Sequence, residues 1–429
     1  MAAGERDARA PASSWYWHQF AVHGGQAAAP RRLRRGGTRW PGCAMSTYQS
    51  AAVYVVGAVP VVIWIYLLAG RGGFWRLAAV PVLPRPQMAA KTVVVLIPAR
   101  NEAAVIGAAV TSLMRQSFSG VINLIVIDDA SADGTAAAAT AAAGAVGALP
   151  HLTVLRGAPL PQGWTGKLWA LSQGVTAAAR YQPDYLLFTD ADIRHGRDSV
   201  ATLVAHAEAQ ERDLVSHMVK LSTAAPAERL LIPAFVFFFF KLYPPAWVAD
   251  PRRKLAAAAG GCILIRPRAL ERMGGLQAIR ARIIDDCALA RAVKDSGGRI
   301  WLGPARDTCS IRIYGSYAEI GSMISRTAFA QLGHSYLLLA ATVAGLFFTY
   351  LLPVALLFVA NPLLRGLGVA ALVLMSLCYL PMIRFYGLAA PWCLGLPAIA
   401  VFYLGAVIHS AVQYARGSGG KWKGRVQDG

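Results

Sequence analysis

Two long apolar stretches limit what this chain can fold into, because they bracket a middle region of different character. Residues 51–70 carry no charged side chain, and a bilayer-spanning helix needs about 20 apolar residues. A second apolar block divides into pieces near 337–360, 367–383 and 391–412. Charged residues make up 15% of the 429 residues, against about a quarter in soluble domains. These features exclude a purely soluble protein and a disordered one.

Basic residues beside these stretches predict how the chain sits in a membrane. Arg71 and Arg76 directly follow the first stretch, so the positive-inside rule places the middle region in the cytosol and makes 45–70 an anchor. A cleaved signal peptide is less consistent with the sequence, because the stretch is long and no A-x-A-like site follows it. If 336–414 forms three spans, the basic tail over 415–429 ends outside, against the same rule. Either one segment is re-entrant or interfacial, or the rule fails for this tail.

The first 44 residues differ in composition from the rest of the chain. They are rich in Ala, Gly and Arg, and they lack any hydrophobic periodicity. Met45 would give a compact start directly before the first apolar stretch. We therefore expect 1–44 to be an upstream extension that is disordered or not made at all. A genuine basic cytosolic arm is the alternative, and it would conflict with an N-terminus outside the cell.

The formal net charge of +20 does not indicate nucleic-acid binding. No Lys/Arg-rich run is interleaved with aromatic residues, and much of the excess lies in the two termini beside the apolar stretches. Basic residues in that position are more typical of the cytoplasmic side of a membrane protein. The six cysteines form no CxxC pair and no close Cys/His cluster, which argues against a disulfide framework or a structural zinc site.

Residues 91–335 alternate apolar strands with helical stretches, which is the pattern of an α/β domain. Such alternation implies a mostly parallel sheet covered on both faces, and ligands bind such sheets beyond the carboxyl ends of their strands. The expected strands are 91–99, 121–129, 151–155 and 184–192, and the expected helices are 102–116, 135 to about 146, and 166–180.

Asp190 and Asp192 end an apolar strand and form a candidate metal site. Two carboxylates can hold a divalent cation such as Mg²⁺ or Mn²⁺ through oxygen ligands. That cation would neutralise the diphosphate of a nucleotide-sugar. A strand-terminal turn followed by a helix N-cap is the alternative, because Asp favours both positions. Two other strands also end in acidic residues, and this coincidence favours the metal site.

Other polar residues at the strand ends are candidates for contacts with the donor. Asp128 and Asp129 could accept hydrogen bonds from a base or ribose, although a turn and capping motif fits the same residues. Glu102 is either a donor contact or a first-turn acid favoured by the helix dipole. Lys167 could meet a phosphate, and a solvated lysine is the alternative. The candidate donor-binding residues of these segments are Pro98, Asn101, Glu102, Asp128, Asp129, Lys167 and Asp190.

The motifs PARNE, DDASADGT, GKLWAL and TDAD occur in the order and spacing of family 2 glycosyltransferases. Over about 45–425 the chain resembles the bacterial hopene-associated glycosyltransferases, and more distantly the ceramide glucosyltransferases. The resemblance implies a GT-A type nucleotide-sugar-binding domain with transmembrane helices, a nucleotide-sugar donor and a divalent cation. It also implies a multi-pass protein of the bacterial inner membrane whose catalytic domain is cytosolic.

The same resemblance assigns a catalytic base. The family's base is the second acid of a Glu-Asp pair, and the matching pair here is Asp285-Asp286, so Asp286 inherits the role and Asp285 replaces Glu. An inverting transfer needs one carboxylate to take the proton of the acceptor hydroxyl. Neighbouring carboxylates raise the pKa of such a group, which suits a base. A helix N-cap pair is the alternative for these residues.

Two segments bear on the acceptor. Many membrane relatives carry Gln-x-x-Arg-Trp where this chain has Gln331-Leu-Gly-His334-Ser335, so the aromatic residue that would stack on an acceptor sugar is missing. His334 is either a diphosphate contact or an ordinary interfacial histidine. Residues 229–248 are rich in aromatic side chains and are expected to form an interfacial helix with Lys241 snorkelling to the headgroups. A buried core helix is the alternative for this segment.

Three functions remain after these exclusions. The sequence best fits an inverting glycosyltransferase that moves one sugar to a lipid acceptor, such as a hopanoid in view of the resemblance. A polysaccharide synthase is disfavoured by the missing Arg-Trp and the small number of spans. A non-catalytic nucleotide-sugar-binding membrane protein is disfavoured by Asp190, Asp192 and Asp286, and a transporter by the near absence of ionisable residues, apart from His409, in the candidate spans.

Overall fold

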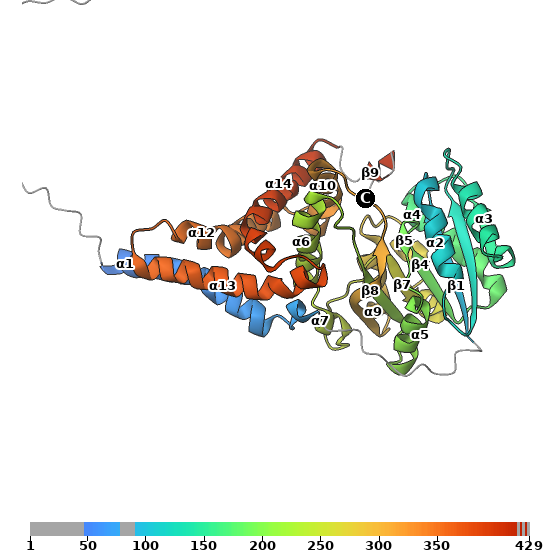
Figure 1. Cartoon of the computed structure of the whole chain (residues 1–429), viewed down its shortest axis with the longest axis horizontal. Coiled ribbons are helices and arrows are strands. Elements are labelled where there is room, and N and C mark those ends of the chain that lie inside the picture. The colour runs from blue at the N-terminus through green and yellow to red at the C-terminus, as the bar shows by residue number, and fades with distance from the viewer. Residues whose placement is uncertain (1–46, 78–90, 418–420, 423–424, 427–429) are drawn as a thin grey trace, which may run out of the picture. The chain divides into compact units, whose positions relative to one another are not determined.

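A computed structural model of the protein describes residues 47–77, 91–417, 421–422 and 425–426 (Figure 1). Residues 1–44, expected to be an extension, and most of the basic tail lie outside the described residues. Residues 51–429 make up one compact unit, which contains both a large sheet and the apolar helices.

One eight-stranded sheet organises the middle region, in the order β3-β2-β1-β4-β7-β6-β8-β5. Its first half confirms the expected parallel strands, because β1 pairs in parallel with β2 and with β4, and β2 pairs in parallel with β3. These four strands are β1 (Thr92–Ala99), β2 (Val121–Asp128), β3 (Leu152–Arg156) and β4 (Tyr185–Thr189).

The second half of the sheet is mixed, so "mostly parallel" describes only part of it. Strand β7 (Cys262–Ile265) runs antiparallel to both β4 and β6 (Leu214–Lys220). Strand β8 (Ile300–Ser310) is parallel to β6 and antiparallel to the short β5 (Ile193–Arg194). Polar residues interrupt β6 and β8, and the continuous apolar signal that revealed the first four strands is therefore missing.

Helices cover both faces of the sheet, which explains why β1 is buried along almost its whole length. Alternate side chains of β1 enter two separate apolar clusters, with Val93 and Val95 in one and Val94 and Leu96 in the other. One cluster includes α2 (Ala103–Met114), α3 (Thr135–Ala145) and α5 (Ser199–Ala209), and the other includes α4 (Gly166–Ala178) and α9 (Asp285–Asp295).

Four helical segments among the described residues are long and apolar enough to cross a membrane. Their first and last residues are close to those of the apolar stretches predicted from the sequence. They are Ala51–Gly70 (in α1 and η1), Tyr336–Leu356 (α11, η6 and α12), Pro362–Phe385 (α13) and Ala390–Ala415 (η7 and α14).

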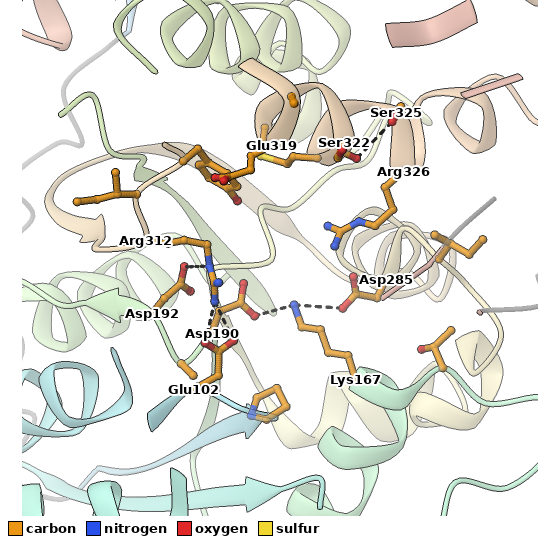
Figure 2. Close-up of a pocket in the computed structure, with 18 of the residues that line it drawn as sticks. Glu102, Lys167, Asp190, Asp192, Asp285, Arg312, Glu319, Ser322, Ser325 and Arg326 are labelled. Carbon is orange, nitrogen blue, oxygen red and sulfur yellow. Dashed lines mark hydrogen bonds and ion pairs between the residues drawn. The ribbon is translucent and has the colours of Figure 1, made fainter. Parts of the chain in front are cut away.

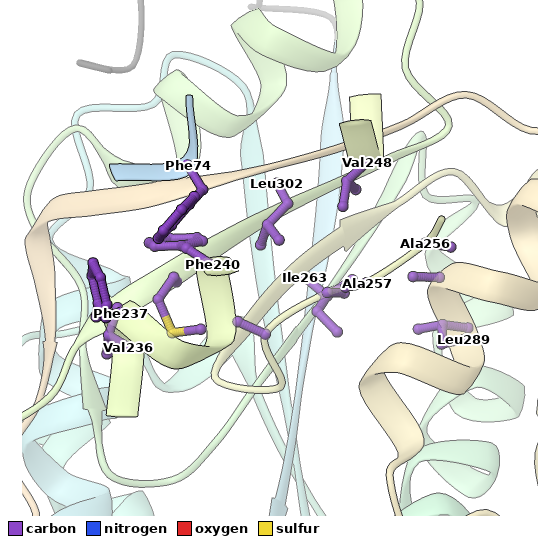
Figure 3. Close-up of a cluster of buried hydrophobic side chains, with 14 of the residues drawn as sticks. Phe74, Val236, Phe237, Phe240, Val248, Ala256, Ala257, Ile263, Leu289 and Leu302 are labelled. Carbon is purple, nitrogen blue, oxygen red and sulfur yellow. The ribbon is translucent and has the colours of Figure 1, made fainter. Parts of the chain in front are cut away.

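The aromatic segment expected at 229–248 forms α6 (Pro226–Leu242) and is largely buried. Phe237 packs between two other aromatic rings. Its ring centroid lies 5.3 Å from that of Phe74 (Figure 3) and 4.9 Å from that of Tyr379 in α13. The ammonium of Lys241 does not follow the expected snorkelling geometry, because it donates a 2.9 Å hydrogen bond to the hydroxyl of Tyr350. The alternative of a buried helix describes these contacts better, and contact with lipid headgroups stays a prediction.

Replacing Phe237 by Ala should destabilise the protein, because the ring is 1% exposed and its removal leaves a cavity between α6, α13 and Phe74. We expect the free energy of unfolding to fall by about 3–5 kcal/mol, the usual cost of Phe→Ala in a core. Denaturant titration of the detergent-solubilised protein measures this. The control Phe358→Ala removes a ring that is 84% exposed and should change stability little; equal losses would contradict the packing.

Candidate active site

The carboxyl ends of β1 and β4 meet at one edge of the sheet and form one wall of a cavity of about 750 Å³. Pro98 and Glu102 reach it from the end of β1, and Asp190 and Asp192 reach it from the end of β4 (Figure 2). Neighbouring strand ends are where ligands bind in this type of sheet. The cavity therefore brings together four of the residues that the sequence singled out.

Lys167 connects this wall to α9. It lies in the first turn of α4, and its Nζ is 2.8 Å from Oδ1 of Asp190 and 3.5 Å from Oδ2 of Asp285. Burial alone would lower the pKa of Lys167, but the two carboxylates raise it above the ordinary value, so the ammonium stays charged. Asp190 and Asp285, which are 95 residues apart in the sequence, thus face one cation.

Asp286 lies on the same side of the sheet as Lys167 and Asp190, in a small recess next to the cavity. Its Oδ2 accepts a 2.9 Å hydrogen bond from the backbone N–H of Gly260, and its Oδ1 accepts one of 2.7 Å from Cys287. The recess shares Pro98, Lys167 and Asp285 with the larger cavity. Burial, and then the charge of Asp285, raise the pKa of Asp286 to about 6. A carboxylate with that pKa is ionised near neutral pH and is more basic than an ordinary one.

Arg312 organises the opposite corner of the cavity. Its Nε is 3.0 Å from Oδ2 of Asp192, and its Nη2 donates to both carboxylate oxygens of Glu102 at 2.8 Å. Ser310 adds a 3.0 Å hydrogen bond to Asp192. Sequence reasoning missed Arg312, because it lies 120 residues from Asp192 and 210 from Glu102 in no recognisable motif.

A second wall of the cavity comes from two helices far along the chain. Helix α10 (Tyr317–Gln331) contributes most of it, and Gln413 of α14 completes it. None of these residues belongs to a recognisable sequence motif, because the spacing of the lining residues on α10 is that of any amphipathic helix. The lining residues of this wall are Ala318, Glu319, Ser322, Met323, Ser325, Arg326 and Gln413.

Four predicted donor contacts do not line the cavity. Asn101 and Asp128 hold the loop after β2, because Asn101 Oδ1 accepts from the N–H of Ala132 and Asp128 Oδ1 accepts from that of Ser131, each at 2.9 Å. A donor contact by either residue stays a prediction.

The other two residues contact neighbouring side chains. Asp129 is 5% exposed and lies 3.6 Å from Arg100. His334 stacks on Tyr414, with ring centroids 4.2 Å apart. A donor contact by Asp129 or His334 also stays a prediction.

Asp190 and Asp192 fit a divalent cation that binds together with a phosphate ligand. Their ion pairs use Oδ1 of Asp190 and Oδ2 of Asp192, so each carboxylate retains a second oxygen for a cation. No cluster of three or more His, Cys, Asp or Glu side chains suited to a metal occurs in the described part of the chain. Mg²⁺ at phosphate sites is commonly held by one or two carboxylates, with the phosphate and water completing its ligands.

Part of the chain around this cavity is similar to known proteins. Residues 94–274, which are fewer than half of the chain, match the family model described as Glycosyl transferase family 2. The enzyme class expected from the motifs is thereby confirmed, as is the GT-A-like fold, with the correction that its sheet is mixed. Asp285 and Asp286 lie beyond the matched residues, and comparison with the curated proteins found no match.

Solved structures similar to the chain include two glycosyltransferases. The mannosyltransferase PcManGT from Pyrobaculum calidifontis, in complex with GDP-Man and Mn²⁺, is 19% identical, with 84% of this chain and 97% of that chain covered and a TM-score of 0.48. Glucosyl-3-phosphoglycerate synthase from Mycobacterium tuberculosis, in complex with Mg²⁺ and uridine-diphosphate, is 17% identical, with coverages of 64% and 82% and a TM-score of 0.37.

Replacing Arg312 by Met should destabilise the protein, because it leaves Glu102 and Asp192, which are largely buried, without their shared cation. We expect a loss of about 1.5–3 kcal/mol in the free energy of unfolding, the range for hydrogen bonds to charged groups. Denaturant titration measures the loss. Arg326→Met is the matched control, because Arg326 lines the same cavity without an ion pair to another described residue. Equal losses in both variants would contradict a bridging role for Arg312.

Proposed function

We propose that the protein is a membrane-bound inverting glycosyltransferase that moves one sugar from a nucleotide-sugar to a hydroxyl group of a lipid. The observation that carries this proposal is the composition of the cavity walls. One wall is the acidic strand edge of the glycosyltransferase domain, and the other includes Gln413 of an apolar helix long enough to cross a membrane. A polar donor and an apolar acceptor could therefore reach the same cavity from different sides.

The donor side requires positive charge for a leaving diphosphate. Lys167 and Arg312 line the cavity but are engaged by carboxylates, whereas Arg282 and Arg326 line it without an ion pair to another described residue. Arg326 comes from α10 and extends into the cavity in Figure 2. We assign these two arginines to the diphosphate. A divalent cation held by Asp190 and Asp192 would supply further neutralisation of the same group.

The acceptor side requires a base. In the proposed reaction, the carboxylate of Asp286 takes the proton from the acceptor hydroxyl while its oxygen forms a bond to the anomeric carbon. The bond from that carbon to the donor phosphate breaks in the same displacement, and the nucleoside diphosphate leaves with the electron pair. One displacement inverts the anomeric configuration, so no protein nucleophile is needed. Gly260 and Cys287 hold the carboxylate by their backbone N–H groups and fix its direction.

Transfer of a single sugar fits better than polymer synthesis, because the Arg-Trp pair typical of many membrane relatives is missing after Gln331. A polysaccharide synthase is the second candidate, and the missing Arg-Trp pair is the only reason for ranking it second. Among lipids, a hopanoid rests on the family resemblance alone. The bacterial inner membrane and a cytosolic catalytic domain rest on that resemblance and on the basic residues after the first apolar stretch.

Membranes containing the full chain should transfer label from one member of a panel of radiolabelled nucleotide-sugars to extractable lipid. Asp286→Asn should abolish this transfer, because an amide cannot accept the proton at neutral pH, and should leave donor binding nearly unchanged. Lipid extraction with scintillation counting measures transfer, and equilibrium dialysis of the donor measures binding. Transfer by Asp286→Asn at the wild-type rate would remove Asp286 as the base. Label found only in insoluble polymer would favour the synthase.

Removal of divalent cations should stop the reaction. We expect EDTA to abolish transfer and added Mg²⁺ or Mn²⁺ to restore it, because Asp190 and Asp192 are placed to hold a cation against the diphosphate. The measurement is the initial rate of lipid labelling before and after addition of the metal. Unchanged turnover in chelator would rule out a metal role for the two carboxylates.

A further inference from the structure

The apolar helix α14 (Leu396–Ala415) contacts the catalytic domain along its first half. The hydroxyl of Tyr403 donates a 3.1 Å hydrogen bond to the backbone oxygen of Leu231 in α6. A Cβ placed at Gly395, just before the helix, would lie 3.6 Å from the side chain of Leu230. The beginning of α14 is therefore fixed against α6, which belongs to the catalytic domain.

The last residues of α14 contact the catalytic domain as well. The backbone N–H of Phe329 in α10 donates a 3.0 Å hydrogen bond to the Ser410 hydroxyl. The ring of Phe329 lies 5.4 Å from that of Tyr414, and Gln413 lines the catalytic cavity. A 20-residue helix is about 30 Å long, enough to cross a bilayer. Because both ends of α14 contact the catalytic domain, the helix runs along that domain and does not extend away from it.

The other apolar helices differ from α14, because they extend away from the catalytic domain and contact one another at their distant ends. Near that end, the amide of Asn361 donates a 2.8 Å hydrogen bond to the hydroxyl of Tyr54, and a Cβ at Gly57 would meet Leu364. At the other end of the same helices, Phe74 and Tyr379 both pack on Phe237 of α6. Figure 1 shows α1 and α13 side by side, extending away from the sheet. These contacts fit helices that cross, with the loop before Asn361 on the far side.

The outer face of α14 needs an apolar partner. Val401, Ile408 and Val412 are spaced by seven and four residues, so they share one stripe of the helix, and they are 53%, 42% and 39% exposed. The opposite face, with Tyr403 and Ser410, is buried against α6 and α10. The chain leaves similar apolar residues exposed on α13, and a bilayer that surrounds α13 is the partner that would cover both helices.

We propose that α14 lies along the membrane surface without crossing it, with the stripe Val401–Ile408–Val412 in the lipid and the opposite face forming part of the cavity wall. The chain then crosses the bilayer three times, and its C-terminus lies on the catalytic side. This inference rests on the membrane attachment proposed above. It removes the conflict with the positive-inside rule, because Arg416 and the basic tail join Arg71 and Arg76 on one side.

The arrangement also gives the lipid acceptor a route. A helix at the membrane surface has one face in the acyl chains and the other toward water or protein. Here the second face carries Gln413 into the cavity beside Met323 of α10. A lipid whose hydroxyl lies at headgroup depth would reach the cavity along this helix without leaving the membrane. The acceptor class that fits is a membrane lipid with its hydroxyl at the polar end.

Cysteine labelling in sealed vesicles tests the topology of the full chain. Single exposed cysteines are introduced as Arg416→Cys after α14, Ala389→Cys after α13, and Ala360→Cys in the loop before α13. A membrane-impermeant maleimide is added to right-side-out and to inverted vesicles, and labelling of the unmodified chain is subtracted. We expect Arg416→Cys to label from the same side as Ala389→Cys and from the opposite side to Ala360→Cys.

The outcomes separate the inference from the proposed function. Labelling of Arg416→Cys from the side of Ala360→Cys means that α14 crosses, which overturns the inference. Labelling of Ala360→Cys and Ala389→Cys from one side means that α13 does not cross the membrane. That result overturns the three-span arrangement and with it the inference. Lipid glycosylation assayed in the same vesicles reports on the reaction independently of either result.

Depth measurement provides a second test. Nitroxide labels at Val401→Cys and Val412→Cys should report the same depth by oxygen and nickel accessibility, because the proposed helix is parallel to the surface. In a crossing helix these positions would differ by about 16 Å. Val369→Cys and Leu377→Cys on α13 are the matched control and should differ by about 12 Å. If the two positions on α14 differ in depth by about 16 Å, the helix crosses the membrane and the inference is overturned.

Discussion

The ion pairs of Lys167 hold the candidate active site together. One ammonium lies within 3.5 Å of carboxylates from the end of β4 and from the start of α9, and Asp286 adds a third negative charge close by. Without a cation at this point, these carboxylates would repel one another and be costly to bury. The burial that makes the cluster costly also raises the pKa of Asp286, so the same arrangement that brings these carboxylates together makes one of them more basic.

Local sequence patterns predicted the parallel half of the sheet because each of its strands is one apolar run between turn residues. The same patterns placed Pro98, Glu102, Lys167 and Asp190 at one site, and the family resemblance added Asp285. The cavity contains all five residues. The interrupted strands β6 and β8 could not be assigned in the same way, since polar residues break their apolar runs and their pairing depends on partners distant in the chain.

Residues that act through distant contacts were beyond sequence reasoning. Arg312 is a lone basic residue in its segment, and its importance arises only because β8 delivers it to Asp192 and Glu102. The acidic sequence after β2 predicts donor contacts, and in the structure the same carboxylates also serve the chain itself, since Asp128 accepts from Ser131 and Asp129 lies near Arg100. Asp and Asn favour turns as strongly as they favour ligands, and a single sequence does not separate these uses.

The position of Gln413 has a consequence for biosynthesis. Glu102 and Asp190 line one wall of the cavity, whereas α10 and Gln413 of α14 line the other, more than 100 residues later in the chain. Translation therefore produces the acidic strand ends well before the helices that cover them. The strand ends face an open site until α10 and then α14 have been synthesised and have packed against the sheet.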